Sequence, residues 1–371
     1  MTIILLSMLI LVLLSLILKR SKTLTIATVV FMWCLATFTY GNADEVIYQS
    51  RYSDIGLWEN DTEYLFLLLI KICRFFGFTF VEYKGVIFAI ILILVSLTTW
   101  KLCKYPNIAL SIFLFYPFFM YISQIRNALA ASVFVFSYRY LLTNENKQLN
   151  VTNKYVNKSD VFFTVCIILA TLIHTASFIW LLLLVPKKLG FKLNVIIAII
   201  LNLFIVASSN ISSIAQIVIS KFGAQTRMEG YLSGTYQLSS YRNYGTIIPI
   251  VFSIMIFMLI YVILWKTTHD NKAILGMKIN IILTVCVSLI LRYSSEFYRL
   301  YEGTMLLNAI IILNLIPKTE ILKIKTKIPY FITECLVSLP TVYFIHFFIP
   351  GIYSTVVFPV LYQNYLFQIF N

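Results

Sequence analysis

Two residues suited to anion binding and proton transfer stand in apolar surroundings in this sequence. Arg126 lies between two apolar runs, and His174 lies in the middle of another. An arginine at membrane depth costs about 2.5–3.5 kcal/mol on insertion scales, so it normally faces a cavity or a partner. We therefore expect Arg126 to bind an anion and His174 to act as a base or to hydrogen-bond the substrate. The alternatives are a helix-end arginine that reaches water and a histidine satisfied within the core.

Two further arginines could bind the same anion. Arg292 and Arg299 are seven residues apart, a spacing that places both on one face if the segment is helical. Glu296 lies between them, so the group either binds a ligand or forms an Arg–Glu–Arg bridge that organises the segment. We expect Arg299 to act in the chemistry and Arg292 to assist it in binding the substrate.

Acidic residues and a tyrosine follow the second apolar run. Asp44 and Tyr48 lie four residues apart directly after it, and Glu63 opens the next apolar segment. A carboxylate can take the proton of an attacking hydroxyl, but these positions also suit helix capping. We expect Asp44 and Glu63 to be candidate bases and Tyr48 to be a candidate substrate contact, with capping as the alternative.

Motifs for metal or nucleotide chemistry do not occur in the sequence. There is no phosphate-binding glycine loop, no acidic metal motif and no GxSxG, and the three histidines are never four residues apart. The six cysteines are scattered and form no CxxC. We therefore expect no metal and no cofactor, and a substrate that arrives already activated within the membrane.

The composition identifies the class of protein. Of 371 residues, 60% are hydrophobic and 12% are charged, against roughly 45–50% and 25% in a soluble domain. The net charge of +14 is explained by lysines in short loops under the positive-inside rule, so we expect no nucleic-acid partner. These features predict an all-α, polytopic transmembrane helical bundle that forms a single integral membrane domain over residues 1–371.

Apolar runs of spanning length predict about 10–11 spans. The expected spans cover residues 2–18, 23–40, 83–100, 106–121, 127–142, 193–207, 246–265, 278–291, 303–316 and 328–349. Segment 160–185 has basic flanks on both sides, which favours a re-entrant hairpin with His174 near its tip over a single span. Segment 63–80 is expected to be an amphipathic helix on the outer face. The expected outer-face segments include 41–82, 208–245 and 292–302.

Lysine and arginine separate between the two sides of this topology. The expected inner loops carry almost only lysine, whereas the arginines gather on the expected outer face. Orientation requires only positive charge, but the planar guanidinium binds phosphate or carboxylate with two hydrogen bonds. We therefore expect an anionic ligand at the outer face. The alternative is that the acidic residues of this face pair with the arginines. Besides those named above, the expected substrate-binding arginines are Arg51, Arg227 and Arg242.

Several of these motifs together resemble the EpsG family of Wzy-like polysaccharide polymerases. The resemblance rests on a first span that ends in a basic turn, Asp44 and Tyr48 after the second span, the segment led by Glu63, and the late Arg299. It rests also on Gln124-Ile125-Arg126-Asn127-Ala128-Leu129-Ala130, which is similar to the family's Ile-Arg-Gln-x-Leu-Ala, and on the run from Ala170 to His174. Asn127 stands where the family has glutamine.

The resemblance implies a bacterial enzyme of the inner membrane that joins oligosaccharide repeat units carried on undecaprenyl pyrophosphate at the outer face. It also implies the bilayer, a chain-length regulator and a flippase as partners. In the expected reaction a sugar hydroxyl attacks an anomeric carbon, the arginines stabilise the leaving pyrophosphate, and His174, Asp44 or Glu63 takes the proton. The alternatives are an O-antigen ligase, a flippase for the same lipid, or a membrane acyltransferase.

Overall fold

The computed structural model describes residues 3–58, 63–143, 157–207, 271–283, 298–315 and 353–366. Within these ranges the chain is helical, apart from turns, caps and one isolated bridge between Thr39 and Asn364. The elements are α1 (Ile3–Ile17), α2 (Lys22–Phe38), α3 (Glu45–Ser53), η1 (Ile55–Trp58), α4 (Tyr64–Phe75), α5 (Phe80–Leu102), α6 (Pro106–Phe115), α7 (Phe118–Ser123), α8 (Ile125–Leu141), α9 (Lys158–Ile173), η2 (Thr175–Leu183), α10 (Leu184–Lys188), α11 (Phe191–Ala207), α15 (Asn271–Leu283), α17 (Tyr298–Leu315), η5 (Tyr353–Val357) and α19 (Phe358–Tyr362). The expected all-helical class is confirmed for this part of the chain.

The outward faces of several helices are apolar. Leu13 and Ile17 of α1 are 61% and 74% exposed, and Leu203 of α11 is 64% exposed. Soluble proteins rarely expose contiguous apolar patches larger than a few hundred Å², so these faces suit contact with lipid. Among the described helices, α5 is the one long and apolar enough to cross a bilayer by itself, and several others are apolar but shorter. The number of spans and the side of each loop stay predictions.

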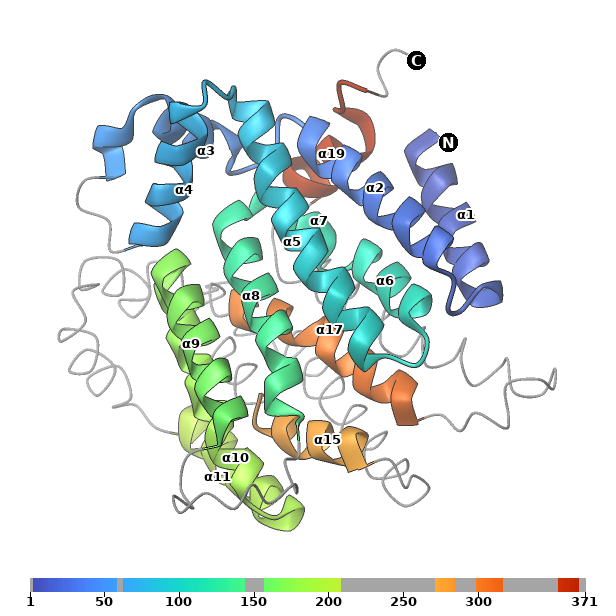
Figure 1. Ribbon diagram of the computed structural model, residues 1–371, viewed down its shortest axis with the longest axis vertical. Helices are drawn as coiled ribbons and strands as arrows, with labels where there is room; N and C mark the ends of the chain where they lie inside the picture. The colour runs from blue at the N-terminus through green and yellow to red at the C-terminus, as the bar shows by residue number, and fades with distance from the viewer. Residues whose placement is uncertain are drawn as a thin grey trace.

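Helix α8 lies at the centre of the bundle, against α5 and α9, while α2 packs on α5 and α17 packs on α6 and α8 (Figure 1). Small buried side chains on α8, such as Ala130 and Ala131, allow this close approach. Gly303 likewise lets α17 lie close to its neighbours. A Cβ at this position would lie only 3.2 Å from the ring of Trp180. Trp180 in turn stacks on Phe134 of α8 with ring centroids 4.2 Å apart. This packing brings α8, η2 and α17 together.

Two expected spans differ from the helices that the chain forms, each for a reason that the backbone shows. The expected span 106–121 is two helices, because Pro117 cannot continue a helix and holds Tyr116 in an extended conformation (φ −162°, ψ 131°). Helix α5 begins at Phe80 rather than at residue 83. Its start is set by a capping box, in which Thr79 and Glu82 bind each other's backbone N–H groups.

Two later helices extend beyond the expected spans. Residues 271–277 of α15 are helical although they precede the expected span 278–291, and residues 298–302 of α17 are helical although they precede the expected span 303–316. Lysine and arginine are good helix formers, so a charged residue marks the end of an apolar run without ending the helix. The expected spans 246–265 and 328–349 lie outside the described residues.

The segment expected to form a hairpin does fold back on itself. Helix α9 ends at His174, whose extended backbone (φ −149°, ψ 113°) breaks the helix before η2 begins. The chain then returns through α10, where Lys187 Nζ lies 2.6 Å from Asp160 Oδ1 in the first turn of α9. The ends of the segment therefore meet, and His174 lies at its turn, as the charge pattern predicts.

The last described segment is attached to the end of α2. The Tyr40 N–H donates to Gln363 O over 2.9 Å, and the Tyr365 N–H donates to Phe38 O over 3.0 Å. The rings of Tyr40 and Tyr365 stack with centroids 4.4 Å apart. Residues 353–366 thus lie beside the chain that leads from α2 to α3, where Figure 1 shows α19 next to α2.

Candidate active site

The carboxylate of Glu63 joins three parts of the chain that are far apart in sequence. Its Oε1 lies 2.7 Å from His174 Nδ1 and accepts the Thr175 N–H over 3.2 Å. Its Oε2 forms an ion pair with Arg126 Nη1. The Glu63 side chain is 1% exposed, and those of Arg126 and His174 are 14% and 13% exposed. A buried carboxylate held by three donors fixes the mutual positions of an arginine and a histidine.

Each of the three side chains occupies the end of a helix. Glu63 precedes α4 and makes no side-chain capping bond, so its carboxylate is directed away from its own helix. Arg126 lies in the first turn of α8. His174 ends α9, and its N–H still donates to Ala170 O over 2.8 Å. Side chains at helix ends can converge in this way because the backbone there changes direction.

The surroundings of Glu63 favour its ionised form. Burial alone would raise the pKa of Glu63, but the hydrogen bond and charge of His174, the charge of Arg126 and the Thr175 N–H together hold it below its ordinary value. A carboxylate with a lowered pKa and three donors is a weak proton acceptor. Glu63 is therefore suited to orienting His174 and Arg126 rather than to acting as the base.

A second carboxylate lies close to the same arginine in a different environment. Burial raises the pKa of Asp44 above its ordinary value, and the positive charges of Arg299 and Arg126 partly oppose this rise. The backbone of Arg126 contacts the hydroxyl of Tyr48, one turn further along α3. Asp44, Tyr48, Arg126 and Arg299 therefore share one electrostatic environment. Two carboxylates whose pKa values are shifted in opposite directions are suited to different roles.

Comparison with known proteins now adds to this geometry. The family model of the EpsG family matches residues 22–359, which is most of the chain. The chain belongs to the EpsG family. EpsG-like proteins are Wzy-like polymerases, so a polysaccharide polymerase-like activity and association with the membrane follow for this EpsG protein at that general level. No curated protein and no solved structure matches it.

All five expected catalytic residues of this EpsG protein lie in described elements, and they gather. Glu63, Arg126 and His174 are in direct contact, and the charges of Arg126 and Arg299 act on Asp44. The expected substrate contact Tyr48 belongs to the same group, and Arg51 lies in the last turn of α3. Arg227, Arg242 and Arg292 lie outside the described residues, so their roles stay predictions.

The sequence analysis missed two buried polar pairs beside these residues. Asn127 Nδ2 donates to Glu302 Oε2 over 2.9 Å, which joins the start of α8 to α17 one turn after Arg299. Lys84 on α5 pairs with Glu45, the residue after Asp44. Lys84 was recognisable, because it stands at the start of an apolar run as Arg126 does. Nothing in the sequence indicated the partners.

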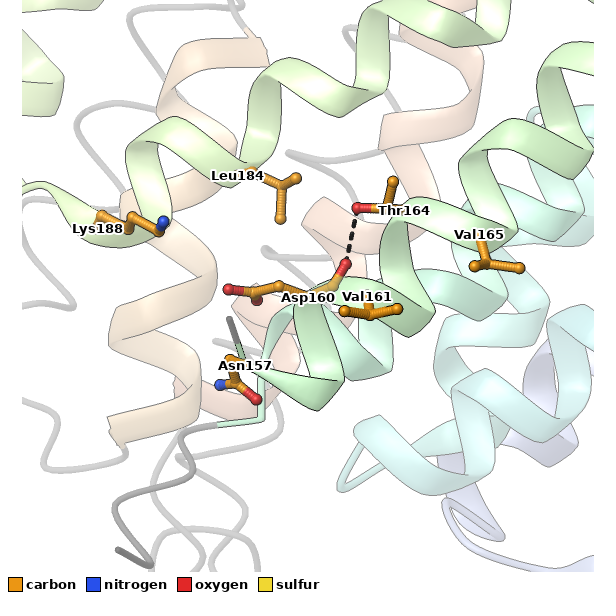
Figure 2. A pocket seen from close by; sticks show the side chains of 7 residues that line it. All are labelled: Asn157, Asp160, Val161, Thr164, Val165, Leu184 and Lys188. Carbon is orange, nitrogen blue, oxygen red and sulfur yellow. Dashed lines mark hydrogen bonds between the residues drawn. The ribbon is translucent and has the colours of Figure 1, made fainter. Parts of the chain in front are cut away.

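A pocket in the described part of the chain lies elsewhere. It has a volume of about 270 Å³ and lies between the first turns of α9 and α10, with Asp160, Thr164, Leu184 and Lys188 among its lining residues (Figure 2). Asp160 is 14 positions before His174, a separation of about 21 Å along a helix. The pocket is therefore at the opposite end of α9 from the Glu63 cluster, beside the expected basic loop. We assign the chemistry to the cluster, because the charged and titratable groups converge there.

Proposed function

We propose that this protein is a glycosyltransferase of the bacterial inner membrane that polymerises oligosaccharide repeat units carried on undecaprenyl pyrophosphate. It would cross the membrane many times and act at the outer face. Family membership supports a polysaccharide polymerase, and the contacts of Glu63 support the reaction in particular. One buried carboxylate holds a candidate base and a candidate anion-binding group side by side, as transfer from a pyrophosphate donor requires.

His174 would be the base. Its Nδ1 faces the Glu63 carboxylate, so the Nδ1 proton is donated to Oε1 and the lone pair lies on Nε2. Nε2 takes the proton of an acceptor sugar hydroxyl as the hydroxyl oxygen attacks the anomeric carbon of the other unit. A positioned base of this kind contributes about 10²–10⁴-fold to the rate. Glu63 keeps the ring in the required tautomer and orientation, as a carboxylate does for histidine in hydrolytic triads.

Arg126 and Arg299 would bind the leaving group. As the new glycosidic bond forms, the bond from the anomeric carbon to the pyrophosphate oxygen breaks, and its electron pair leaves with undecaprenyl pyrophosphate. A guanidinium has five N–H donors, so the ion pair of Arg126 with Glu63 does not exhaust its capacity for phosphate oxygens. The arginines stabilise the negative charge as it develops, and no metal is required for this step.

Asp44 would stabilise the positive charge that develops on the sugar. Glycosyl transfer passes through a state with positive charge on the sugar ring, which a nearby carboxylate stabilises. Asp44 lies in the field of both arginines. It would therefore lie close to the position where the bond between sugar and phosphate breaks. A deprotonated Asp44 would stabilise the sugar while the arginines stabilise the departing phosphate.

The test is the surface-glycan pattern of a strain that lacks this protein. We expect the deletion to leave single repeat units at the surface and the wild-type gene to restore the ladder of longer chains. The His174→Ala variant should give single units at normal protein abundance. The control is His269→Ala, which removes a histidine between the expected spans 246–265 and 278–291 and should restore the ladder. Lipid-linked units trapped on the cytoplasmic face would instead indicate a flippase. Full-length polymer that stays on its lipid would indicate a ligase.

A further inference from the structure

Asp44 occupies a helix-capping position that it does not use. It is the N-cap residue of α3, where aspartate ordinarily accepts a hydrogen bond from the second or third backbone N–H of the helix. Here the Asp44 side chain makes no such bond, and its environment is dominated by burial and by the charges of Arg299 and Arg126. The Asp44 carboxylate is thus not used to hold the start of α3, which depends on other contacts.

Lys84 supplies one such contact from α5. Its side chain is 1% exposed, and its Nζ donates to Thr39 O over 2.6 Å and to Glu45 Oε1 over 2.7 Å. Thr39 ends α2, and Glu45 is the first residue of α3. The one ammonium group thus holds both ends of the short connection that carries Asp44. Glu45 also suits the first turn of a helix, where the backbone dipole favours negative charge.

Residues 353–366 also contact the connection between α2 and α3 that carries Asp44. Asn364 Nδ2 donates to Leu35 O over 3.1 Å and to Thr39 Oγ1 over 3.3 Å. The Ala43 N–H donates to Thr355 O over 3.0 Å. Backbone and side chain of Thr39 are both held, as is the residue before Asp44. A segment this constrained is suited to presenting one side chain in a fixed direction.

We propose that Lys84, through its pair with Glu45, is a positioning residue that holds Asp44 towards Arg126 and Arg299. This role rests on the proposed function, because it gives Asp44 a part in glycosyl transfer. Burying an ion pair is not an efficient source of stability, since apolar side chains of similar volume often do as well. Specific positioning accounts for Lys84 and Glu45 better than stability does.

A kinetic cycle tests this role without leaving a buried charge unpaired. The Lys84→Met/Glu45→Leu double variant replaces the pair by apolar groups and leaves the net charge unchanged. Polymerisation of purified lipid-linked repeat units is measured in proteoliposomes, with and without Asp44→Asn. We expect the double variant to lower kcat at least tenfold with little change in KM. In the Asp44→Asn background it should cause no further loss, because the pair acts through Asp44.

The control is Lys71→Met, which removes an exposed lysine of α4 and should leave kcat unchanged. An equal loss of kcat in both Asp44 backgrounds, or no loss at all, would overturn the proposal. If the double variant does not accumulate, Lys84→Arg keeps the charge but changes the donor geometry. It should lower kcat only where Asp44 is present, and a loss that ignores Asp44 would again overturn the proposal.

The cycle separates this inference from the proposed function. If Asp44→Asn polymerises at the wild-type rate while His174→Ala is inactive, then the role of Lys84 is refuted and the polymerase assignment stands. If His174→Ala also polymerises at the wild-type rate, then the proposed mechanism fails as well.

Discussion

Replacing Glu63 by glutamine separates its role in orientation from a role as the base. The glutamine Oε1 can still accept from His174 and from the Thr175 N–H, but its NH₂ group then faces the guanidinium of Arg126, donor against donor. The variant therefore keeps the shape of the site and breaks the ion pair. The Arg126 side chain, 14% exposed, is left without this partner for its charge.

The structure sets the expected magnitudes. Breaking a buried ion pair by removing one partner costs about 3–5 kcal/mol of unfolding free energy, a large part of the roughly 5–15 kcal/mol of a typical protein. Movement of Arg126 and loss of the carboxylate charge that stabilises protonated His174 should lower kcat by about 10²–10⁴-fold, the range of a positioned base. The loss of rate must therefore be expressed per folded molecule.

The assay is the joining of purified lipid-linked repeat units in proteoliposomes, followed as a glycan ladder and normalised to the amount of folded protein. Glu82→Gln is the matched control. It removes another carboxylate that starts a helix, but glutamine can still serve in the capping box with Thr79. We expect Glu82→Gln to polymerise normally. A wild-type kcat for Glu63→Gln would refute the reasoning, because the contacts of this carboxylate would then not matter for the reaction.

Three further predictions follow from the same contacts. Arg126→Lys keeps the charge but loses the planar pair of donors, so chain length on glycan gels should fall sharply; wild-type chains would show that a point charge is enough. Because the charge of Arg299 lowers the pKa of Asp44, Arg299→Gln should move the infrared titration of that carboxyl, identified by its loss in Asp44→Asn, to higher pH; an unchanged midpoint would contradict the shared environment. Reporter fusions at Lys158 and Lys188, at the two ends of the hairpin, should both report the cytoplasm, and opposite sides would mean that the segment spans the membrane.

The sequence was sufficient to select residues that gather in the candidate site, but not their contacts. Arg126 and His174 could be recognised because a charged or titratable side chain in an apolar run needs a partner. Glu63 could be recognised as an acid at the start of a helix. Their convergence could not be predicted, since it depends on how α4, α8 and α9 pack, and residues 63 and 174 are 111 positions apart. The charge of Glu63 also made it a candidate base until its three donors were known.

The helices of the fold were likewise predictable from local sequence, whereas contacts between distant segments were not. Hydropathy predicted the helices α1, α2, α8 and α11 to within a few residues, because their apolar runs are continuous. The break at Pro117 and the capping box of Thr79 and Glu82 also have local sequence signals, but the length of an apolar run does not register them. The attachment of residues 353–366 to the end of α2 left no local signal, because it is made largely by backbone groups.

That attachment affects when the site can form during synthesis. The hydrogen bond from Asn364 to Leu35 joins residues 329 positions apart. At the usual rates of translation of about 5–20 residues per second, the second partner follows the first by roughly 16–65 s. The connection that carries Asp44 thus gains these anchors only after residues 355–364 have left the ribosome. A chain synthesised only as far as residue 352 would already contain Arg126 but not a fixed Asp44, so under the proposed role of Asp44 activity would begin only after residues 353–366 are in place.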